Sequence, residues 1–469
     1  MKCFGRIFVL SLFCIFFLNP LNAQDQDTSK NSAYVITNVN VIPMNNSEIL
    51  KNMHVIVEEG RITGVGPSAE TAIPLGAQKI NGQGKYLMPG LAEMHGHIPG
   101  EEQPQYAEGV LFLYIANGVT TVRNMLGTNY QLQLRDRVQN GDLPGPTIFA
   151  ASPWLSREAI PNPEATKRIV KEHKAAGFDL LKIGSLDPET YKQMARTAHE
   201  INMPFGGHIP EAVGLEGALE ARQTSIDHYD RYVEFLVSEE AKEGRSNGFF
   251  GSGIIDLIDR EKIPEAIKMT VEAGTWNVPT LSLVEHLARE ESAEEMITRP
   301  EMRYMPKSVL TSWVKFKNEY DQREDFQPEA TAALVKFRRE LTKKLHEAGA
   351  KIVLGSDAPQ FFNVPGFSIH HELEMMVNTG LSPYEVLVTG TKNTAEYFGT
   401  PEEFGTVHQG RRADLILLNA NPLNDITNVQ NRAGVMVRGL WYPEEKIGQK
   451  LKEIEERNKG SSLIVGDQA

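Results

Sequence analysis

The stretch Leu87-Met-Pro-Gly-Leu-Ala-Glu-Met-His95-Gly-His97 is an apolar run that ends in two histidines one residue apart. In an extended strand, residues i and i+2 point to the same face. The imidazoles of His95 and His97 would therefore lie side by side at the carboxyl end of a strand, where they can bind one divalent metal ion. Short histidine pairs also arise by chance, so this pattern needs support from elsewhere in the chain.

Three later segments also run apolar and then end on a residue that can bind metal. They are Met203-Pro-Phe-Gly-Gly-His208, Ser225-Ile-Asp-His228 and Ile352-Val-Leu-Gly-Ser-Asp357. A lysine, Lys182, lies inside a further apolar run. Each residue alone has an ordinary explanation, such as entry into a helix or the start of a turn. Chance is a poor explanation for four separate strands that all end in this way. Together they predict a metallohydrolase.

The middle of the chain alternates predicted strands with helical stretches such as residues 188–202 and 211–222. Eight strand–helix units match a (β/α)8 TIM barrel of the α/β class better than an open sheet. In a barrel, side chains at the carboxyl ends of different strands converge on one mouth. The strands are expected at residues 87–97, 119–125, 146–152, 180–185, 203–209, 224–229, 276–283 and 351–358.

Both ends of the chain carry the alternating pattern of β-strands, and they could pair into one small β-sandwich because domain termini tend to lie close together. The expected organisation follows from this pairing. It comprises a signal peptide (1–23), the N-terminal part of the sandwich (24–86), the barrel (87–404), the C-terminal part of the sandwich (405–458) and a flexible tail (459–469).

Two connections are much longer than the usual few residues, 231–274 after the sixth strand and 285–350 after the seventh. Insertions at these points lie over the mouth of a barrel, where a substrate lid would sit. Packing against the barrel or contacts in a homo-oligomer explain them equally well. The sequence leaves these alternatives open.

The first residues are typical of an export signal, with Lys2 and Arg6 before an apolar stretch at 7–18 and Ala23 at the expected cut. The stretch is short for a bilayer span, so we expect a secreted or periplasmic protein without stable membrane insertion after signal removal. A retained signal anchor is the alternative.

Cysteines and charge exclude several classes of function. Cys3 and Cys14 both lie in the predicted signal, so the mature chain would contain no disulfide, cysteine nucleophile or cysteine-ligated zinc. The formal net charge of -13 argues against nucleic acid as a partner.

The chain resembles the amidohydrolase superfamily, in the branch of imidazolonepropionase-like and prolidase-like enzymes, which are binuclear metal-dependent hydrolases. The resemblance rests on the motifs above and covers nearly the whole mature chain. Asp227, before His228, is a departure, because relatives usually carry Glu there. The similar segments continue through His371-Glu-Leu-Glu, Thr391-Lys-Asn-Thr-Ala and Gly410-Arg-Arg-Ala-Asp-Leu-Ile-Leu-Leu.

This resemblance implies two divalent metal ions, with Zn²⁺ the expected metal. One ion would be held by His95, His97 and Asp357, and the other by His208 and His228. Lys182 would be carboxylated by carbon dioxide, so that its carbamate bridges the ions. A carbamate supplies anionic oxygens, whereas an ammonium beside two dications would be repelled. An unmodified lysine that is structural or contacts substrate is the alternative.

The implied reaction is hydrolysis of a C–N bond in a small amide or dipeptide, as in prolidase-like dipeptidases or N-acyl amino acid amidases. A hydroxide held between the ions would attack the carbonyl, and Asp357 would shuttle the proton to the leaving nitrogen. A single-metal cyclic amide hydrolase or deaminase is the runner-up, against which Lys182 counts. A non-catalytic binding protein on the same fold is a remote alternative.

Three further residues are candidate contacts to substrate. Tyr229 directly follows His228, His286 follows the seventh strand, and Arg123 ends the second strand. Arg123 could bind a substrate carboxylate, or it could pair with a neighbouring Asp.

Overall fold

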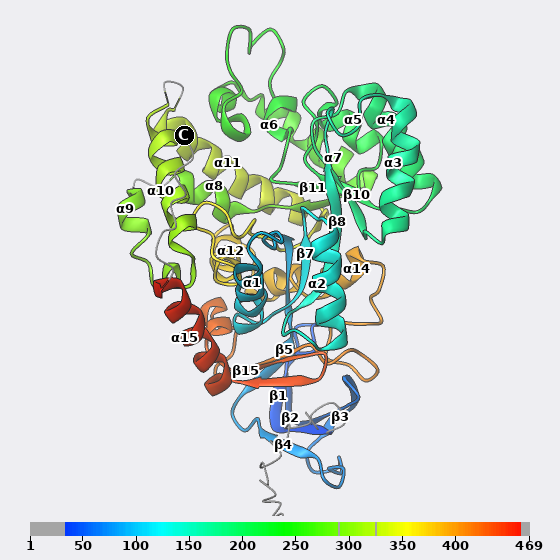
Figure 1. The fold of residues 1–469 in the computed structure, drawn as a ribbon, viewed down its shortest axis with the longest axis vertical. Coiled ribbons are helices and arrows are strands. Elements are labelled where there is room, and N and C mark those ends of the chain that lie inside the picture. Colours follow the sequence, from blue (N-terminus) through cyan, green and yellow to red (C-terminus); the bar gives the residue numbers. More distant parts are fainter. Residues whose placement is uncertain (1–32, 289–290, 324–325, 461–469) are drawn as a thin grey trace, which may run out of the picture.

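Parallel strands from the middle of the chain close into a (β/α)8 barrel (Figure 1). The computed structural model describes residues 33–288, 291–323 and 326–460. The strands follow each other around the barrel in chain order, and the barrel closes where the backbone N–H of His97 donates to the carbonyl of Ala358 at 2.8 Å. The barrel strands are β6 (Leu91–Gly96), β7 (Val119–Asn124), β8 (Thr147–Leu155), β9 (Leu180–Ile183), β10 (Phe205–Gly207), β11 (Ser225–Asp227), β12 (Trp276–Val278) and β13 (Lys351–Ile352).

Helices follow the barrel strands, and their ends obey local rules. The side chain of Thr128 caps the start of α2 together with Gln131, and the helix ends at Gly141 with a φ of 82°. Because these signals are local, the alternation of strand and helix was readable from the sequence. The helices are α1 (Pro104–Ala116), α2 (Asn129–Asn140), α3 (Pro163–Ala176), α4 (Pro188–Glu200), α5 (Gly214–Glu220), α7 (Ile263–Ala273), α8 (Leu281–Ala288), α11 (Pro328–Glu347), α12 (Phe367–Val377), α13 (Pro383–Thr389) and α14 (Lys392–Tyr397).

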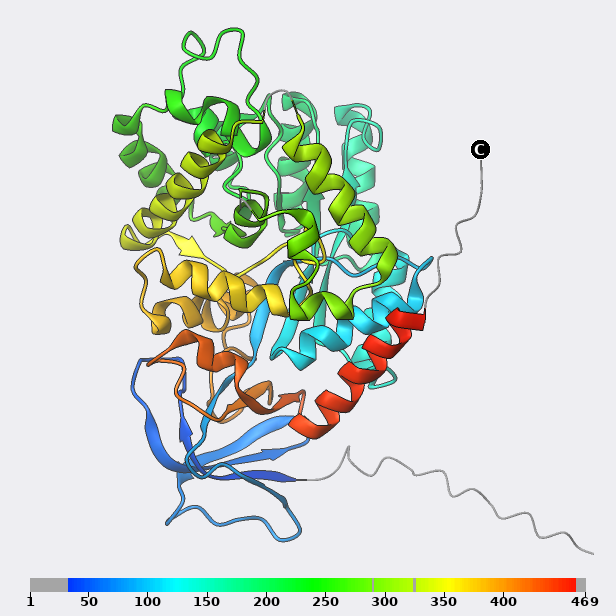
Figure 2. The same cartoon turned by 90° about the vertical axis from the view of Figure 1, so that its left-hand side faces the viewer.

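Both ends of the chain contribute strands to a second sheet, which also has eight strands and lies below the barrel in a smaller domain (Figures 1 and 2). It is called the small sheet after this domain. The predicted fold class is confirmed, although the predicted sandwich is a single hydrogen-bonded sheet. Val39, Val55 and Leu415 belong to one apolar core that strands of both ends share. The strands are β1 (Tyr34–Val41), β2 (Leu50–Glu58), β3 (Arg61–Pro67), β4 (Gln78–Asn81), β5 (Tyr86–Pro89), β14 (Leu415–Leu418), β15 (Arg432–Val437) and β16 (Leu440–Pro443).

The run that we predicted as one strand over residues 87–97 is divided between the two sheets. Strand β5 pairs with β1 and β14 in the small sheet, whereas β6 begins the barrel. Gly90 separates them, and a Cβ there would lie 2.1 Å from Oγ1 of Thr120. The backbone therefore passes Thr120 more closely than any side chain at position 90 would allow.

The C-terminal segment differs from the predicted β-structure, because it ends in a helix, α15 (Glu444–Gly460). This helix packs on α1 and on the 3₁₀ helix η4 (Pro300–Tyr304). Ile447, Leu451 and Ile454 recur at helical spacing and supply its apolar face. The predicted signal peptide and most of the predicted tail lie outside the described residues, and no helix among the described residues is both long and apolar enough to cross a membrane.

The two long insertions are mainly helical. Figure 1 shows α6 at the end of the barrel opposite the small sheet. In the first insertion, the 3₁₀ segment η2 packs against both α6 and α11. The additional elements are α6 (Tyr232–Phe235), η2 (Phe249–Leu257), η3 (Arg260–Lys262), α9 (Ala293–Met296), α10 (Lys307–Asp321) and, after β14, η5 (Ile426–Gln430).

Candidate metal centre

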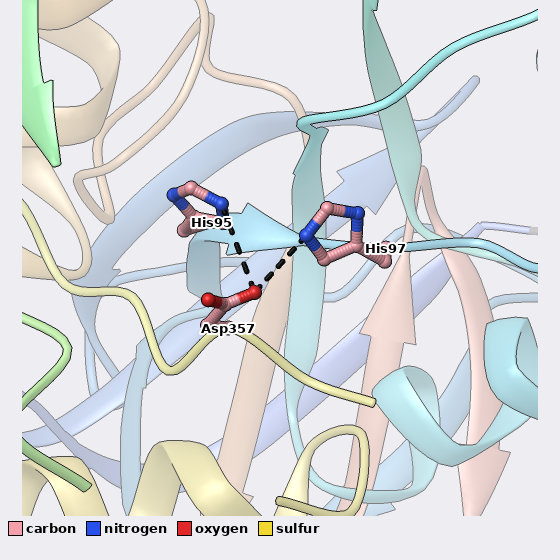
Figure 3. Close-up of side chains that lie close together, drawn as sticks. All are labelled: His95, His97 and Asp357. Carbon is pink, nitrogen blue, oxygen red and sulfur yellow. Dashed lines mark ion pairs between the residues drawn. The ribbon is translucent and has the colours of Figure 1, made fainter. Parts of the chain in front are cut away.

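Two histidines and one aspartate meet at the carboxyl end of the barrel strands. His95 lies on β6, His97 directly follows it, and Asp357 follows β13 (Figure 3). Oδ1 of Asp357 lies 3.0 Å from Nε2 of His97 and 3.7 Å from Nε2 of His95. One donor atom from each of the three residues lies within 4.8 Å of the others. This spacing suits three ligands of one metal ion.

The other three predicted ligands gather around the same point. Nζ of Lys182 lies 3.3 Å from Nε2 of His95. Nε2 of His228 lies 3.7 Å from Oδ2 of Asp357, and the ring centroids of His228 and His208 are 5.0 Å apart. The structure thus brings together six side chains from five different strand ends. Their roles as metal ligands stay predictions.

Three of the histidines use Nδ1 to contact a neighbouring acceptor, which leaves Nε2 free to face the centre. Metal-binding histidines are held in this way by an acceptor on their second nitrogen, which fixes the orientation of the ring. The contacts are His95 to Asp227 at 2.6 Å, His208 to Asp230 at 2.8 Å and His228 to Thr280 at 2.8 Å.

Burial controls the charge of these groups. It lowers the pKa of Lys182, and it lowers the pKa values of His95 and His228 well below the usual range for histidine. Burial raises the pKa of Asp357, but the nearby His95, His97 and Lys182 outweigh this effect and hold that pKa at about 2. Neutral imidazoles and an ionised carboxylate are the forms that bind metal.

The residues present fit a divalent metal ion. Oδ2 of Asp357 accepts a hydrogen bond from Nε2 of Gln360 at 3.0 Å, whereas the buried Oδ1 has no well-directed hydrogen bond among the described residues and faces Nε2 of His97 at 3.0 Å. A buried carboxylate oxygen without a hydrogen bond is costly, and a metal ion would satisfy it. Imidazole nitrogens and carboxylate oxygens are also the ligand types that zinc accepts.

Arg123 lies beneath the cluster rather than at an open surface. Its side chain is fully buried and donates to Oδ2 of Asp227 at 2.7 Å. It also donates to Ser225 at 2.8 Å and to Tyr397 at 2.6 Å. Two alternatives were open for Arg123, and the structure shows the ion pair with a neighbouring aspartate. Because Asp227 also contacts His95, it orients a predicted ligand, a role that the sequence did not indicate.

The other two candidate substrate contacts lie apart from the cluster. The hydroxyl of Tyr229 donates to Oγ1 of Thr342 at 2.9 Å. His286 on α8 lies 3.3 Å from Nη1 of Arg299 and is buried. Neither side chain is among the described residues that gather around Asp357.

Two aromatic residues that were not predicted as site residues flank the cluster. The ring of Trp154 lies 5.4 Å from that of His208, and the ring of Phe250 lies 5.4 Å from that of His228. Trp154 was missed because the third strand runs to Leu155, three residues beyond its predicted end. Phe250 lies in the first insertion, and no periodic sequence pattern indicated where this insertion lies relative to the cluster.

The sequence profile of the amidohydrolase family matches residues 86–441. The chain belongs to the amidohydrolase family. The predicted resemblance is confirmed, and the match spans the whole barrel, β14, β15 and the first residues of β16. This amidohydrolase is a metal-dependent hydrolase that acts on carbon–nitrogen bonds.

Named relatives are similar over most of their length. Ochratoxinase from Aspergillus niger is 22% identical over 458 residues, which cover 83% of this chain and 82% of that protein. Imidazolonepropionase from a Shewanella species is 22% identical over 400 residues, covering 78% and 86%. The structure of a Xaa-Pro dipeptidase with bound methionine has a TM-score of 0.66 at 20% identity and covers 88% of this chain and 100% of that one. At this identity the structural similarity shows the fold alone.

Proposed function

We propose that this amidohydrolase cleaves the C–N bond of a small amide, in a dipeptide or an N-acyl amino acid, at a two-metal centre. The observation that carries the proposal is the position of Lys182. Its side chain is 1% exposed, and its Nζ lies 3.3 Å from a ring nitrogen of His95. A protonated lysine at the centre of a histidine cluster would be repelled by metal ions, whereas a carboxylated lysine could bridge them as a ligand.

Carboxylation of Lys182 follows from its surroundings. Burial lowers the pKa of its amine, which favours the neutral form that reacts with carbon dioxide. The amine gains CO₂ and loses one proton, and the product is an anionic carbamate. Its two oxygens would complete a donor set with His95, His97 and Asp357 on one side and with His208 and His228 on the other. Zn²⁺ is the expected metal for this set.

Asp357 is the group that would move the proton. Divalent ions at such a centre polarise an amide carbonyl and acidify water. Asp357 is ionised and buried, and Gln360 holds its Oδ2. The carboxylate can therefore accept the proton of the attacking water and deliver it to the leaving nitrogen.

The comparisons support amide hydrolysis without selecting a substrate. The Xaa-Pro dipeptidase favours the dipeptide class. Imidazolonepropionase represents the second candidate, a cyclic amide hydrolase or deaminase with one metal. The buried position of Lys182 favours the two-metal reaction, because a single-metal site has no need of a bridging lysine.

Metal content per chain tests the proposal. We expect about two zinc ions in protein lacking residues 1–23 and a sharp fall in Lys182→Ala, together with loss of dipeptide and N-acyl amino acid hydrolysis. Lys192→Ala is the matched control, because Lys192 is an exposed lysine on α4, the helix that follows β9. About one zinc in both the wild type and Lys182→Ala would remove the bridging role and direct the search to cyclic amides and deamination.

We also propose export of the mature protein, supported by Lys2, Arg6 and the apolar residues 7–18. A chain without thiols after Ala23 suits an oxidising compartment. Mass spectrometry of protein recovered outside the cytoplasm is expected to give Gln24 as the first residue. An intact N-terminus would contradict cleavage at this point.

A further inference from the structure

Four aromatic rings form a continuous row across the candidate metal centre. Trp154 contacts His208 at a centroid distance of 5.4 Å, His208 contacts His228 at 5.0 Å, and His228 contacts Phe250 at 5.4 Å. The two imidazoles are predicted metal ligands, and the two apolar rings lie at the ends of the row. A scissile amide bound at the proposed metal centre would therefore have one apolar ring towards each end of the row.

The ring of Trp154 is held in place while remaining accessible. Its side chain is 40% exposed, which makes it one of the few large apolar side chains that face solvent. Nζ of Lys182 lies 5.5 Å from the centroid of the ring. A Cβ at Gly184 would lie 1.8 Å from Nε1 of the indole, so the absence of a side chain at Gly184 makes room for it. An exposed indole beside a metal centre is suited to contact with an apolar group of a ligand.

Phe250 is held on the opposite side of the row. Its backbone has a φ of 52°, in the left-handed region that phenylalanine rarely adopts. The surrounding contacts fix this conformation, because Phe249 packs edge-on against the ring at 4.4 Å and the guanidinium of Arg338 lies 5.6 Å from it. The ring is only partly buried. The protein thus holds a partly exposed phenylalanine beside a predicted metal ligand.

The arginines next to the cluster already form hydrogen bonds or ion pairs with other groups of the protein. These arginines are therefore not available to a charged side group at either end of the row, since arginine is the usual ligand of a carboxylate. The constraint concerns only the two side groups, and the carboxylate of an N-acyl amino acid would have to lie away from these arginines. The contacts are Arg123 to Asp227, Arg231 to Glu234 and the carbonyl of Ile209, and Arg338 to the carbonyls of His228 and Pro279.

We infer that Trp154 and Phe250 are specificity-determining residues that select amides with an apolar ring on both sides of the scissile C–N bond. This inference rests on the proposed function for the position of the scissile bond. It adds a substrate class, N-aroyl derivatives of aromatic amino acids, to a reaction that is otherwise defined only as amide hydrolysis.

Four ligands with the same amide and carboxylate test the inference. They are N-benzoyl-L-phenylalanine, N-benzoyl-L-alanine, N-acetyl-L-phenylalanine and N-acetyl-L-alanine, titrated calorimetrically into Zn²⁺-loaded protein. Each ring is expected to tighten binding by about tenfold. Trp154→Ala and Phe250→Ala should each abolish the advantage of one ring, and Trp154→Phe should retain part of it. Leu50→Ala is the matched control, because Leu50 is an apolar residue of the small sheet with 37% exposure.

Binding and turnover separate the two proposals. Equal affinity for the four ligands would overturn the inference even if all were hydrolysed, and so would a ring advantage that survives in Trp154→Phe, Trp154→Ala and Phe250→Ala alike. The expected order of affinities without hydrolysis of any ligand would support the two ring contacts and contradict the proposed amide hydrolysis.

Discussion

At the scale of single residues, the buried pair of Arg123 and Asp227 is the contact on which the cluster depends most. Both side chains are fully buried, and Nη2 of Arg123 lies 2.7 Å from Oδ2 of Asp227. Two charges removed from water repay their desolvation only while both are present. Because the same oxygen of Asp227 contacts Nδ1 of His95 at 2.6 Å, the pair links the stability of the barrel to the orientation of a ligand.

Loss of one member of the pair should destabilise the fold. Arg123→Met leaves Asp227 as an uncompensated buried charge, so we expect the free energy of unfolding in urea to fall by roughly 3–5 kcal/mol. The double variant with Asp227→Asn should recover part of the loss. Arg168→Met is the control, because the pair of Arg168 with Glu172 is exposed and should contribute about 0–1 kcal/mol. Equal effects of Arg123→Met and Arg168→Met would refute this assignment.

Asp227→Asn alone should weaken metal binding. An amide cannot match the carboxylate as partner for Nδ1 of His95, and loss of such a partner typically costs 10–100-fold in affinity, so roughly that loss is expected here. Competition with a zinc chelator measures it. Asp256→Asn serves as the comparison, because Asp256 is an exposed aspartate paired with Arg245. Unchanged zinc affinity in Asp227→Asn would show that His95 keeps its orientation without this contact.

The sequence indicated where the predicted ligands lie but not what holds them. His95, His208, His228 and Asp357 each terminate an apolar run, and parallel strands bring such ends together whatever the loops do. Thr280, by contrast, contacts His228 across 52 residues of sequence. Contacts of this kind depend on how neighbouring strands align, which no local pattern records.

At the scale of elements, α8 begins beside the candidate centre and takes its cap from another helix. The carboxylate of Glu372, on α12, accepts the backbone N–H groups of Leu281 and Ser282 at 2.8 Å each. These are unpaired donors of the first turn of α8, where a negative charge is also favoured. Thr280, which contacts His228, directly precedes the helix. Glu372 therefore holds the start of α8 in place, next to Thr280, the residue that contacts the predicted metal ligand His228.

Burial of Glu372 should make stability depend on pH, because its cost to the charged form outweighs the hydrogen bonds of the cap. Burial raises the pKa of Glu372 to about 7 from a usual 4.5. Since this pKa is higher in the folded state, the stabilisation is complete below pH 4.5 and is lost as the pH rises through 7. The free energy of unfolding should therefore fall over that window in the wild type and fall less in Glu372→Gln. The exposed Glu396 provides the control Glu396→Gln. Parallel curves for the wild type and Glu372→Gln would count against the assignment.

Elements with a strong local pattern were predictable, and those shaped by close approach were not. All eight barrel strands overlap their expected ranges, because buried parallel strands have continuous apolar runs. The division at Gly90 was missed, since the run is apolar on both sides and only the proximity of Thr120 requires the break. The sequence contains the helical spacing of Ile447, Leu451 and Ile454. This segment was nevertheless predicted as β-structure because it follows two predicted strands.

At the scale of the whole molecule, two partly buried arginines join the small sheet to the barrel. Arg432 donates to the carbonyl of Ala116 at 3.1 Å and to Oδ1 of Asn117 at 3.1 Å. Arg438 donates to the carbonyls of Val138 and Gly145 at 3.1 Å and 3.0 Å. Charged donors on backbone carbonyls form strong hydrogen bonds. The two sheets should therefore unfold as one unit.

Calorimetry tests this coupling. We expect one unfolding transition in the wild type and still one in Arg432→Met, at a lower temperature, because the substitution removes hydrogen bonds worth roughly 2–4 kcal/mol in total. Arg61→Met is the control, since Arg61 is half exposed in its pair with Glu403. Two separate transitions in the wild type would show that the sheet and the barrel fold independently.

The passage from β5 to β6 at Gly90 sets the order in which a newly made chain can become active. Strand β5 pairs with β1 on one side and with β14 on the other, and the ribosome produces β14 near the end of synthesis. His95 lies on β6, the strand that follows β5. A nascent chain thus cannot complete the anchorage of β6 before its last strands have emerged. A polypeptide that cannot complete its fold until translation is nearly over would remain compatible with the proposed export, and its candidate metal centre would form only afterwards.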